Sequence, residues 1–252
     1  MKKALVLLTL LASCSAPSVS VLPAVIDNSL TGSISGATGG GVSGSNDLEA
    51  LGLGDSDFVF TPRVDLNFMS SQISITSSSS AFSGSGTVDS EIEFGGEGIG
   101  VGVDVDTDMD VGATNLLWTF NFVNTDTAHF GLGLGLSAFD FSLAMEETGV
   151  PMNSINTDEM LPVPLLGIRA GGDLGMIRIA GSLATLQVDA DGGEISVTDL
   201  DVYAGIDIIG DTGTLVVGYR SFDLDANYDD GEDSVALELG LGGPYFGLRL
   251  SF

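Results

Sequence analysis

The sequence predicts an all-β protein, an antiparallel up-and-down transmembrane β-barrel of ten strands, with eight strands as the alternative. Three observations predict this fold. Apolar and polar residues alternate with a period of two along the chain after residue 25, and no sustained period of 3.6 residues interrupts them. The expected connections alternate between short turns and longer, acidic loops. The number of expected strands is even, as in bacterial outer-membrane barrels.

The composition excludes three classes of protein. The chain has 252 residues, of which 44% are hydrophobic, so it is too apolar for a disordered acidic tail despite a formal net charge of -28. Seven basic residues against 35 acidic ones exclude a nucleic-acid-binding protein, because a phosphate backbone requires clustered Lys and Arg. No run of about 18 apolar residues follows the leader, which excludes a helical membrane protein.

The N-terminal residues have the layout of a secretory signal peptide. Met1, Lys2 and Lys3 precede an apolar run and then small residues, so we expect a signal peptide over residues 1–24 and a single barrel domain over 25–252. The run that ends at Cys14 resembles a bacterial lipoprotein box, which makes Cys14 a candidate for acylation. The alternative is ordinary cleavage somewhere between Ser15 and Ala24, with Cys14 discarded. One cysteine allows no internal disulfide in either case.

The alternation places the strands and their connections. We expect strands near 30–37, on both sides of a tight turn at 69–71, and near 106–123, 129–145, 161–171, 175–189, 194–209, 213–226 and 235–252. Short turns are expected at 69–71, 124–128, 172–174 and 210–212, and long acidic loops at 39–57, 88–105, 146–160 and 227–234. The connection at 190–193 is short on the side where the others are long. This arrangement is typical of barrels with turns in the periplasm and loops outside the cell.

Several strands carry an apolar face of the length that crosses a bilayer, about 9–11 residues. The clearest are Leu116, Trp118, Phe120 and Phe122; Phe130, Leu132, Leu134 and Leu136; and Leu200, Val202, Ala204, Ile206 and Ile208. In lipid, such faces point outward all the way round a barrel.

Every arginine has the parity opposite to the apolar face of its strand. An arginine that faces lipid at the bilayer centre costs about 2 to 4 kcal/mol, so we expect all five in the lumen. Their carboxylate partners would share the inward parity, because an unpaired buried charge is strongly destabilising. The predicted lumen charge network consists of Arg63, Asp65, Arg169, Arg178, Asp199, Asp201, Asp207, Arg220 and Arg249, with Tyr203 completing the hydrogen bonding. It forms either a structural plug of paired charges or a polar path for small ions.

The last residues look like the C-terminal signal strand of Gram-negative outer-membrane proteins, which the barrel assembly machinery recognises. Phe246, Leu248, Leu250 and Phe252 share one face, and the chain ends on an aromatic residue. The apolar parity changes between Leu241 and Phe246, and we expect a β-bulge at the intervening glycines as its cause.

The chain resembles a family of uncharacterised Gram-negative outer-membrane β-barrel proteins of similar length. The resemblance is carried by Gly84-Ser85-Gly86-Thr87, Phe94-Gly95-Gly96, Val105-Asp106-Thr107-Asp108-Met109-Asp110, Val217-Gly218-Tyr219-Arg220 and Gly243-Pro244-Tyr245. It covers most of the chain after residue 47 and implies a barrel fold and a place in the outer membrane. It implies no activity.

Candidate catalytic and metal-binding residues are few. The only histidine, His129, is expected at the periplasmic rim as an interfacial polar residue, and Ser77–Ser80 have no histidine nearby to activate them. We therefore expect no enzymatic activity and no cofactor. Oxygen ligands for divalent cations are densest in the last loop, where the weak candidates are Asp225, Asn227, Asp229 and Asp230. Cations bound there could bridge the loops to lipopolysaccharide.

The leading hypothesis is an integral barrel of the cell outer membrane, structural or weakly permeable. Its expected partners are outer-membrane lipid, lipopolysaccharide and, during insertion, the barrel assembly machinery. One rival is a narrow channel that prefers cations, and a second is a barrel enzyme that acts on membrane lipid through His129. The third is an acylated β-sandwich lipoprotein tethered through Cys14.

Overall fold

The computed structural model describes residues 17–37, 44–94, 97–125, 127–148, 154–190, 193–210, 212–229 and 234–252. Its secondary structure is entirely β within these ranges, and no helix in them is long and apolar enough to cross a membrane. The wall consists of long strands: β1 (Ser18–Ala37), β3 (Ser56–Phe68), β4 (Ser71–Thr87), β7 (Asp104–Asn124), β8 (Ala128–Glu147), β9 (Ser154–Leu174), β10 (Ile177–Ala190), β11 (Gly193–Ile209), β12 (Gly213–Asp229) and β13 (Ser234–Ser251). Three short strands accompany them: β2 (Asn46–Asp47), β5 (Ile92–Phe94) and β6 (Glu97–Ile99).

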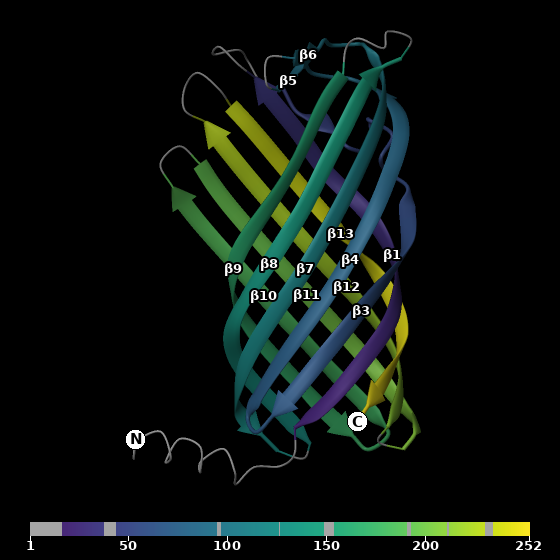
Figure 1. Ribbon diagram of the computed structural model, residues 1–252, viewed down its shortest axis with the longest axis vertical. Helices are drawn as coiled ribbons and strands as arrows, with labels where there is room; N and C mark the ends of the chain where they lie inside the picture. Colours follow the sequence, from purple (N-terminus) through teal and green to yellow (C-terminus); the bar gives the residue numbers. More distant parts are fainter. Residues whose placement is uncertain are drawn as a thin grey trace, which may run out of the picture.

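The ten long strands close into a ring (Figure 1). Each pairs antiparallel with the long strand before it, and β1 pairs with β13 from Ser20↔Ser251 to Ala37↔Ser234. The predicted ten-stranded up-and-down barrel is therefore confirmed. The β-sandwich rival is wrong, because a sandwich needs two separate sheets and this sheet closes on itself.

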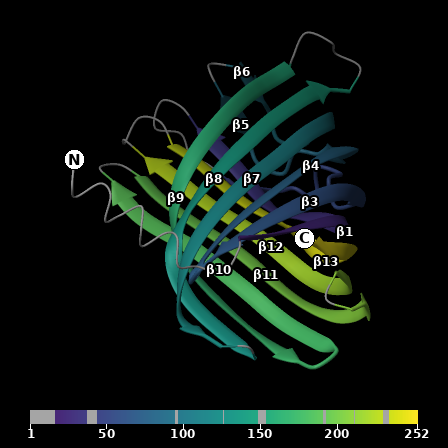
Figure 2. The same cartoon turned by 60° about the horizontal axis from the view of Figure 1, so that its bottom comes forward.

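The connections separate the two ends of the barrel. Tight connections at 69–70, 125–127, 175–176 and 210–212 lie at one end, which we call the turn end. Met69 at φ 56°, Gly175 at 74° and Gly210 at 52° supply the left-handed backbone that such turns require. The start of β1 and the C-terminus lie at the same end (Figures 1 and 2). By the general rule for outer-membrane barrels, the turn end faces the periplasm and the opposite loop end faces outside.

Strand β1 begins at Ser18, well before the expected residue 30. It therefore includes residues 18–24, which we expected in the signal peptide, and these pair with both β3 and β13. The alternation is hidden in this stretch because the inward residues Leu22, Ala24 and Ile26 are as apolar as the outward ones. Residues 1–16, including Cys14, lie outside the described part of the chain.

The expected bulge near Gly242 is absent from the described residues of β13. The pairing of β12 with β13 runs without a register shift from Asp229↔Ser234 to Gly213↔Leu250. Leu241 is buried inside the barrel and Phe246 is 58% exposed on the outer surface. The apolar side of the strand therefore changes from inside to outside while the backbone continues regularly.

The same change occurs along the other long strands and divides the wall into two halves. In the inner half, next to the turn end, the outward residues are largely apolar: Val19, Phe68, Ile75, Leu116, Trp118, Phe120, Phe130, Leu132, Leu134, Leu136, Leu166, Ile168, Ile177, Ile179, Val202, Ile206, Leu215, Val217 and Phe246. In the outer half, next to the loop end, most exposed positions are polar or acidic: Asp104, Asp106, Asp108, Asp110, Asp140, Glu146, Gln187, Asp189, Glu194, Asp223, Asp225 and Glu238. Val188 and Tyr228 are exposed there as well. The inner half is therefore the part that fits the membrane, and the outer half stands above it.

The interior of the outer half is a packed apolar core. Its members include Leu30, Ile34, Phe82, Met109, Phe139, Phe141, Leu143, Met145, Val163, Leu165, Val197, Phe222, Leu224, Leu239 and Leu241, all of them buried. Residues 44–55, which we call the inserted segment, add Leu48, Leu51 and Leu53 to this core, each at most 1% exposed. The backbone of the inserted segment lies directly against the backbone of β4. This close approach requires glycine, because a Cβ on Gly84 would lie 1.9 Å from the carbonyl oxygen of Gly52.

Candidate functional site

Polar and charged side chains fill much of the interior of the inner half. Arg63, Arg169, Arg220 and Arg249 are each at most 9% exposed, although they come from four different strands. The side chain of Arg178 is 28% exposed near the turn end. All five therefore lie on the lumen side, opposite to the apolar outer face of their strands.

Asp65 is the centre of the main charge cluster. One of its carboxylate oxygens accepts a hydrogen bond from Arg63 Nε at 2.9 Å, and the other accepts one from Arg249 Nη2 at 2.6 Å. The hydroxyl of Ser74 also donates to Asp65. With two cations on one nearly inaccessible carboxylate, this cluster meets the requirement that buried charges be paired.

Asp201 and two tyrosines extend this cluster. Arg63 Nη1 lies 2.5 Å from Asp201 Oδ2, and the Tyr245 hydroxyl donates to Asp201 Oδ1 at 2.8 Å. Arg249 Nη1 donates to the Tyr203 hydroxyl at 2.8 Å. The guanidinium carbons of Arg63 and Arg249 lie 5.6 and 5.0 Å from the Tyr203 ring centre, within cation–π range.

Three predicted members of the network lie apart from this cluster: Arg220, Asp199 and Asp207. Arg220 pairs with Asp199, with nitrogen–oxygen distances of 3.2 and 3.3 Å. Asp207 accepts a hydrogen bond from Thr214 Oγ1 at 2.6 Å, and its expected arginine partner is absent from the described ion pairs.

Sequence reasoning missed Asp173 and Ser74. Asp173 pairs with Arg178 Nε at 2.6 Å, but we had expected residues 172–174 to form a turn. Strand β9 in fact continues to Leu174, so Asp173 has the inward parity of Arg169. That shared parity was the available signal for Asp173, and the position of Ser74 between the outward Ile73 and Ile75 was the signal for the serine.

Arg169 is paired less completely than the other buried arginines. It is 3% exposed, and its hydrogen bond is from Nη2 to the Ser74 hydroxyl at 2.7 Å. Its Nε and Nη1 atoms have no hydrogen-bond partner in the described part of the protein. None of the described ion pairs includes this residue.

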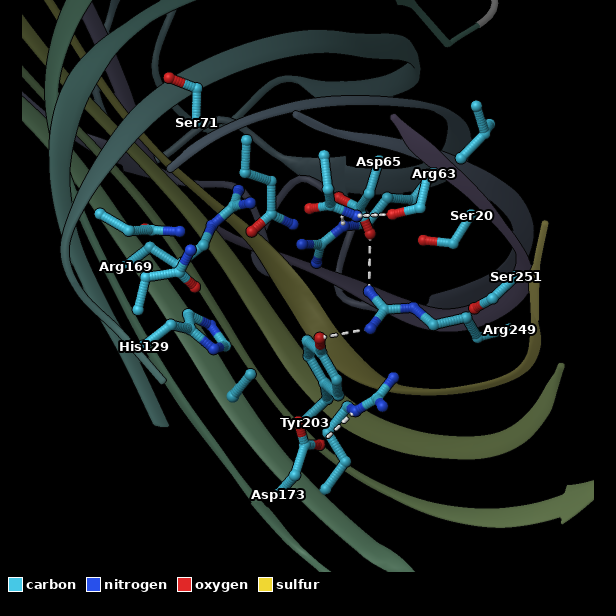
Figure 3. A pocket seen from close by; sticks show the side chains of 18 of the residues that line it. Ser20, Arg63, Asp65, Ser71, His129, Arg169, Asp173, Tyr203, Arg249 and Ser251 are labelled. Carbon is cyan, nitrogen blue, oxygen red and sulfur yellow. Dashed lines mark hydrogen bonds and ion pairs between the residues drawn. The ribbon is translucent and has the colours of Figure 1, made fainter. Parts of the chain in front are cut away.

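A cavity of about 360 Å³ opens beside this cluster at the turn end (Figure 3). We call it the turn-end cavity. Its charged and titratable lining residues are Arg63, Asp65, His129, Arg169, Asp173, Arg178, Tyr203 and Arg249. Serine hydroxyls and the amides of Asn67, Gln72, Asn121 and Asn124 complete much of the polar lining. The cavity is therefore lined mainly by hydrogen-bond donors and charges.

His129 lies in this cavity rather than on an outer interfacial surface. It is on β8, and its ring lies against Gly171 of the neighbouring β9, two residues from Arg169. Figure 3 shows the side chains of His129 and Arg169 near one another at the cavity. The only histidine of the sequence thus faces a polar pocket.

Of the candidate cation ligands, Asp225 and Asn227 have described side chains, and both are exposed. Asn227 Nδ2 donates to Asp225 Oδ1 at 2.8 Å, whereas the side chain of Asp229 and the whole of Asp230 lie outside the described residues. Within the part of the chain that the structure describes, no group of three or more His, Cys, Asp or Glu could hold a metal ion. Asp104 and Asp106 are on the outer wall, where Thr87 and Ser85 donate to them.

The C-terminal residues Phe246, Leu248, Leu250 and Phe252 alternate with inward residues along β13. Phe246 is 58% exposed and Phe252 is 78% exposed, while Arg249 between them points into the lumen cluster. The final strand therefore presents an apolar row to its surroundings and a cation to the interior.

The chain is similar to several solved structures of outer-membrane proteins. The outer membrane protease OmpT from Escherichia coli has a TM-score of 0.64 and 11% sequence identity over 93% of this chain and 97% of the other. Neisserial surface protein A has a TM-score of 0.34 and 12% identity over 95% and 99% of the two chains. The translocator domain of the autotransporter NalP from Neisseria meningitidis has a TM-score of 0.38 and 10% identity over 99% and 96%. The sequence matches no protein-family model and no curated protein.

One expectation has to be corrected by this comparison. We expected a protein without enzymatic activity, but the same barrel fold is found in a protease, so that inference was wrong. At 11% identity the likeness shows the fold alone, because one fold carries many functions. The chain therefore has the closed β-barrel fold of an integral outer-membrane protein, as predicted.

Proposed function

We propose that this barrel is a structural protein of the outer membrane and is closed to solutes. Its outer half, with an acidic exposed surface, stands above the membrane. The observation that supports the proposal is the apolar core of the outer half. Leu48, Leu51 and Leu53 of the inserted segment are fully buried in it, and Phe139 stacks on Phe222 with ring centres 5.4 Å apart. Protein interiors packed in this way leave few voids as large as one water molecule.

The rival function of a narrow cation channel has less support. A channel needs a polar path, and the side chains that meet across the outer half are apolar. The alternating acidic residues Asp104, Asp106, Asp108 and Asp110 do not supply such a path, because they are exposed on the outer wall. Carboxylates in that position repel one another and keep the surface hydrated without lining a path.

Planar-bilayer recordings test the closed barrel. We expect wild-type protein, folded and inserted, to show no stable conductance steps in potassium chloride. Replacing residues 46–54 by a flexible Gly-Ser linker removes Leu48, Leu51 and Leu53 from the core, and we expect this variant to conduct intermittently. Steps of constant, cation-selective conductance in the wild type would instead establish the channel.

The remaining partners are part of the same proposal. The apolar row that ends in Phe252 is the surface we assign to recognition by the barrel assembly machinery. We assign the exposed carboxylates of the outer half, including Asp225, to weak, non-specific contacts with divalent cations and lipopolysaccharide. Cleavage of a signal peptide anywhere before Ser18 would leave β1 intact. In the alternative with Cys14 as the acylated first residue, the lipid would lie four residues before this strand.

A further inference from the structure

We propose that the turn-end cavity is a binding site for a small oxyanion, a phosphate or a carboxylate group, that enters from the periplasm. The juxtaposition that carries this inference is a roomy polar cavity with a buried arginine whose donors are unused. Neither feature is needed for the structural role proposed above. A volume of about 360 Å³ accommodates such a group together with several waters, since each water occupies about 30 Å³.

The charges around the cavity do not balance. Four arginines line it, and the carboxylates paired with them are Asp65, Asp173 and Asp201. Within this set of cavity arginines and their ion-pair partners, one positive charge is in excess, in a chain whose formal net charge is -28. Asp207, the inward carboxylate that accepts from Thr214, does not line the cavity. An acidic protein that concentrates its arginines at one cavity and leaves one charge uncompensated has a local field that attracts anions.

The excess charge belongs to Arg169. Its neighbours Arg63 and Arg249 are held by Asp65, so ion pairing accounts for both of them. Arg169 has only the neutral hydroxyl of Ser74, and its Nε and Nη1 atoms lack partners. A buried guanidinium with unsatisfied donors is costly, and an anion supplies both the missing charge and the missing acceptors.

The surroundings of Arg169 fit an oxyanion. Arg249 Nε is a further buried donor without a partner, and His129, Gln72 and Ser20 line the same cavity. Oxygen atoms of a phosphate or carboxylate would accept from these groups, whereas a cation would find Asp65 already occupied by two arginines. Apolar solutes are disfavoured, because the lining is largely polar.

The test uses the full barrel, purified and folded in detergent, with binding measured by isothermal titration calorimetry. Sodium phosphate and sodium succinate are the two probes, and their relative affinities distinguish a phosphate site from a carboxylate site. We expect at least one of them to bind with a Kd below about 10 mM and to raise the Tm of the barrel. Arg169→Gln should weaken that binding by about tenfold or more, while Arg169→Lys retains part of it.

Two further variants keep the result interpretable. Arg220→Gln removes a buried arginine that does not line the cavity, and the affinity should remain unchanged. Asp173→Asn removes a carboxylate from the lining and frees Arg178, so affinity should rise several-fold, which a purely structural role does not predict.

Heat-modifiable migration on gels verifies folding of each variant. If neither probe binds wild-type protein, or if folded Arg169→Gln and Asp173→Asn bind as wild type does, the site does not exist. Should Arg169→Gln fail to fold, the Asp173→Asn result decides alone.

Discussion

The inner and outer halves of the barrel are built from the same ten strands but place their apolar side chains on opposite faces. On β8, the outward residues are Phe130, Leu132, Leu134 and Leu136 in the inner half, and Asp140 and Glu146 in the outer half. The inward residues change in the reverse sense, from Gly131, Gly133 and Gly135 to Phe139, Phe141, Leu143 and Met145. The inner half is thus arranged as a membrane protein and the outer half as a water-soluble one.

Solvent explains the difference. A strand needs about 9 to 11 residues to cross a bilayer, and β8 has 20 while β9 has 21, so about half of each strand lies beyond the membrane. In water, apolar side chains are driven inside the ring, where the inserted segment completes a core. In lipid they face outward without cost, and much of the interior is left for arginines, tyrosines and a polar cavity. A smaller apolar cluster of Leu22, Ala24, Ile26, Ala180 and Val216 fills the rest.

The largest expected effect concerns the charge cluster of the inner half. Asp65→Leu leaves Arg63 and Arg249 without their shared carboxylate, and breaking a buried pair in this way costs about 3 to 5 kcal/mol of unfolding free energy. Guanidinium chloride unfolding in lipid vesicles measures the loss. Asp65→Asn keeps the shape and some hydrogen bonds, so it should lose less. If Asp65→Leu were as stable as wild type, the cluster would not hold the inner half together.

A pair of arginine substitutions on one face of β8 tests where the membrane ends. Leu134→Arg puts a cation into the lipid-facing surface and should cost about 2 to 4 kcal/mol. Ser142→Arg lies eight residues further along on the same face, opposite Asp110 of β7, and should change stability by no more than about 0.5 kcal/mol. The same unfolding assay in vesicles compares both. Equal costs at the two positions would mean that the membrane boundary does not lie between them.

The smallest effects come from removing one inward hydroxyl in each half. Thr107 is buried in the apolar outer half and its hydroxyl has no partner, so Thr107→Val should stabilise the barrel by up to about 1 kcal/mol. Thr214 in the inner half donates to Asp207 at 2.6 Å, and Thr214→Val should destabilise it by about 1.5 to 3 kcal/mol. Thermal and denaturant unfolding show whether each substitution raises or lowers the unfolding free energy. Opposite signs support the contrast between the halves, and a loss from Thr107→Val contradicts it.

Much of the fold could be predicted because a strand's side-chain period is two, whatever its solvent. That period located most strands and put Arg63, Arg220 and Arg249 on the lumen side. It failed at residues 18–29, where both faces are partly apolar, and at Gly242, where a change of environment resembled a change of register. Alternation shows that two faces differ, but it does not show which solvent each face meets.

The sequence by itself predicted a barrel of ten or eight strands, an outer-membrane location and the face on which each arginine lies, and the closed ring of the structure has ten. Only the tertiary structure decided that Asp65 holds two arginines, that Asp173 pairs with Arg178, that Arg169 keeps unused donors beside a cavity, and that the inserted segment completes the outer core. The physical reason is that parity fixes only the side of the wall, whereas these contacts depend on how far each strand is shifted along its neighbours round the closed ring.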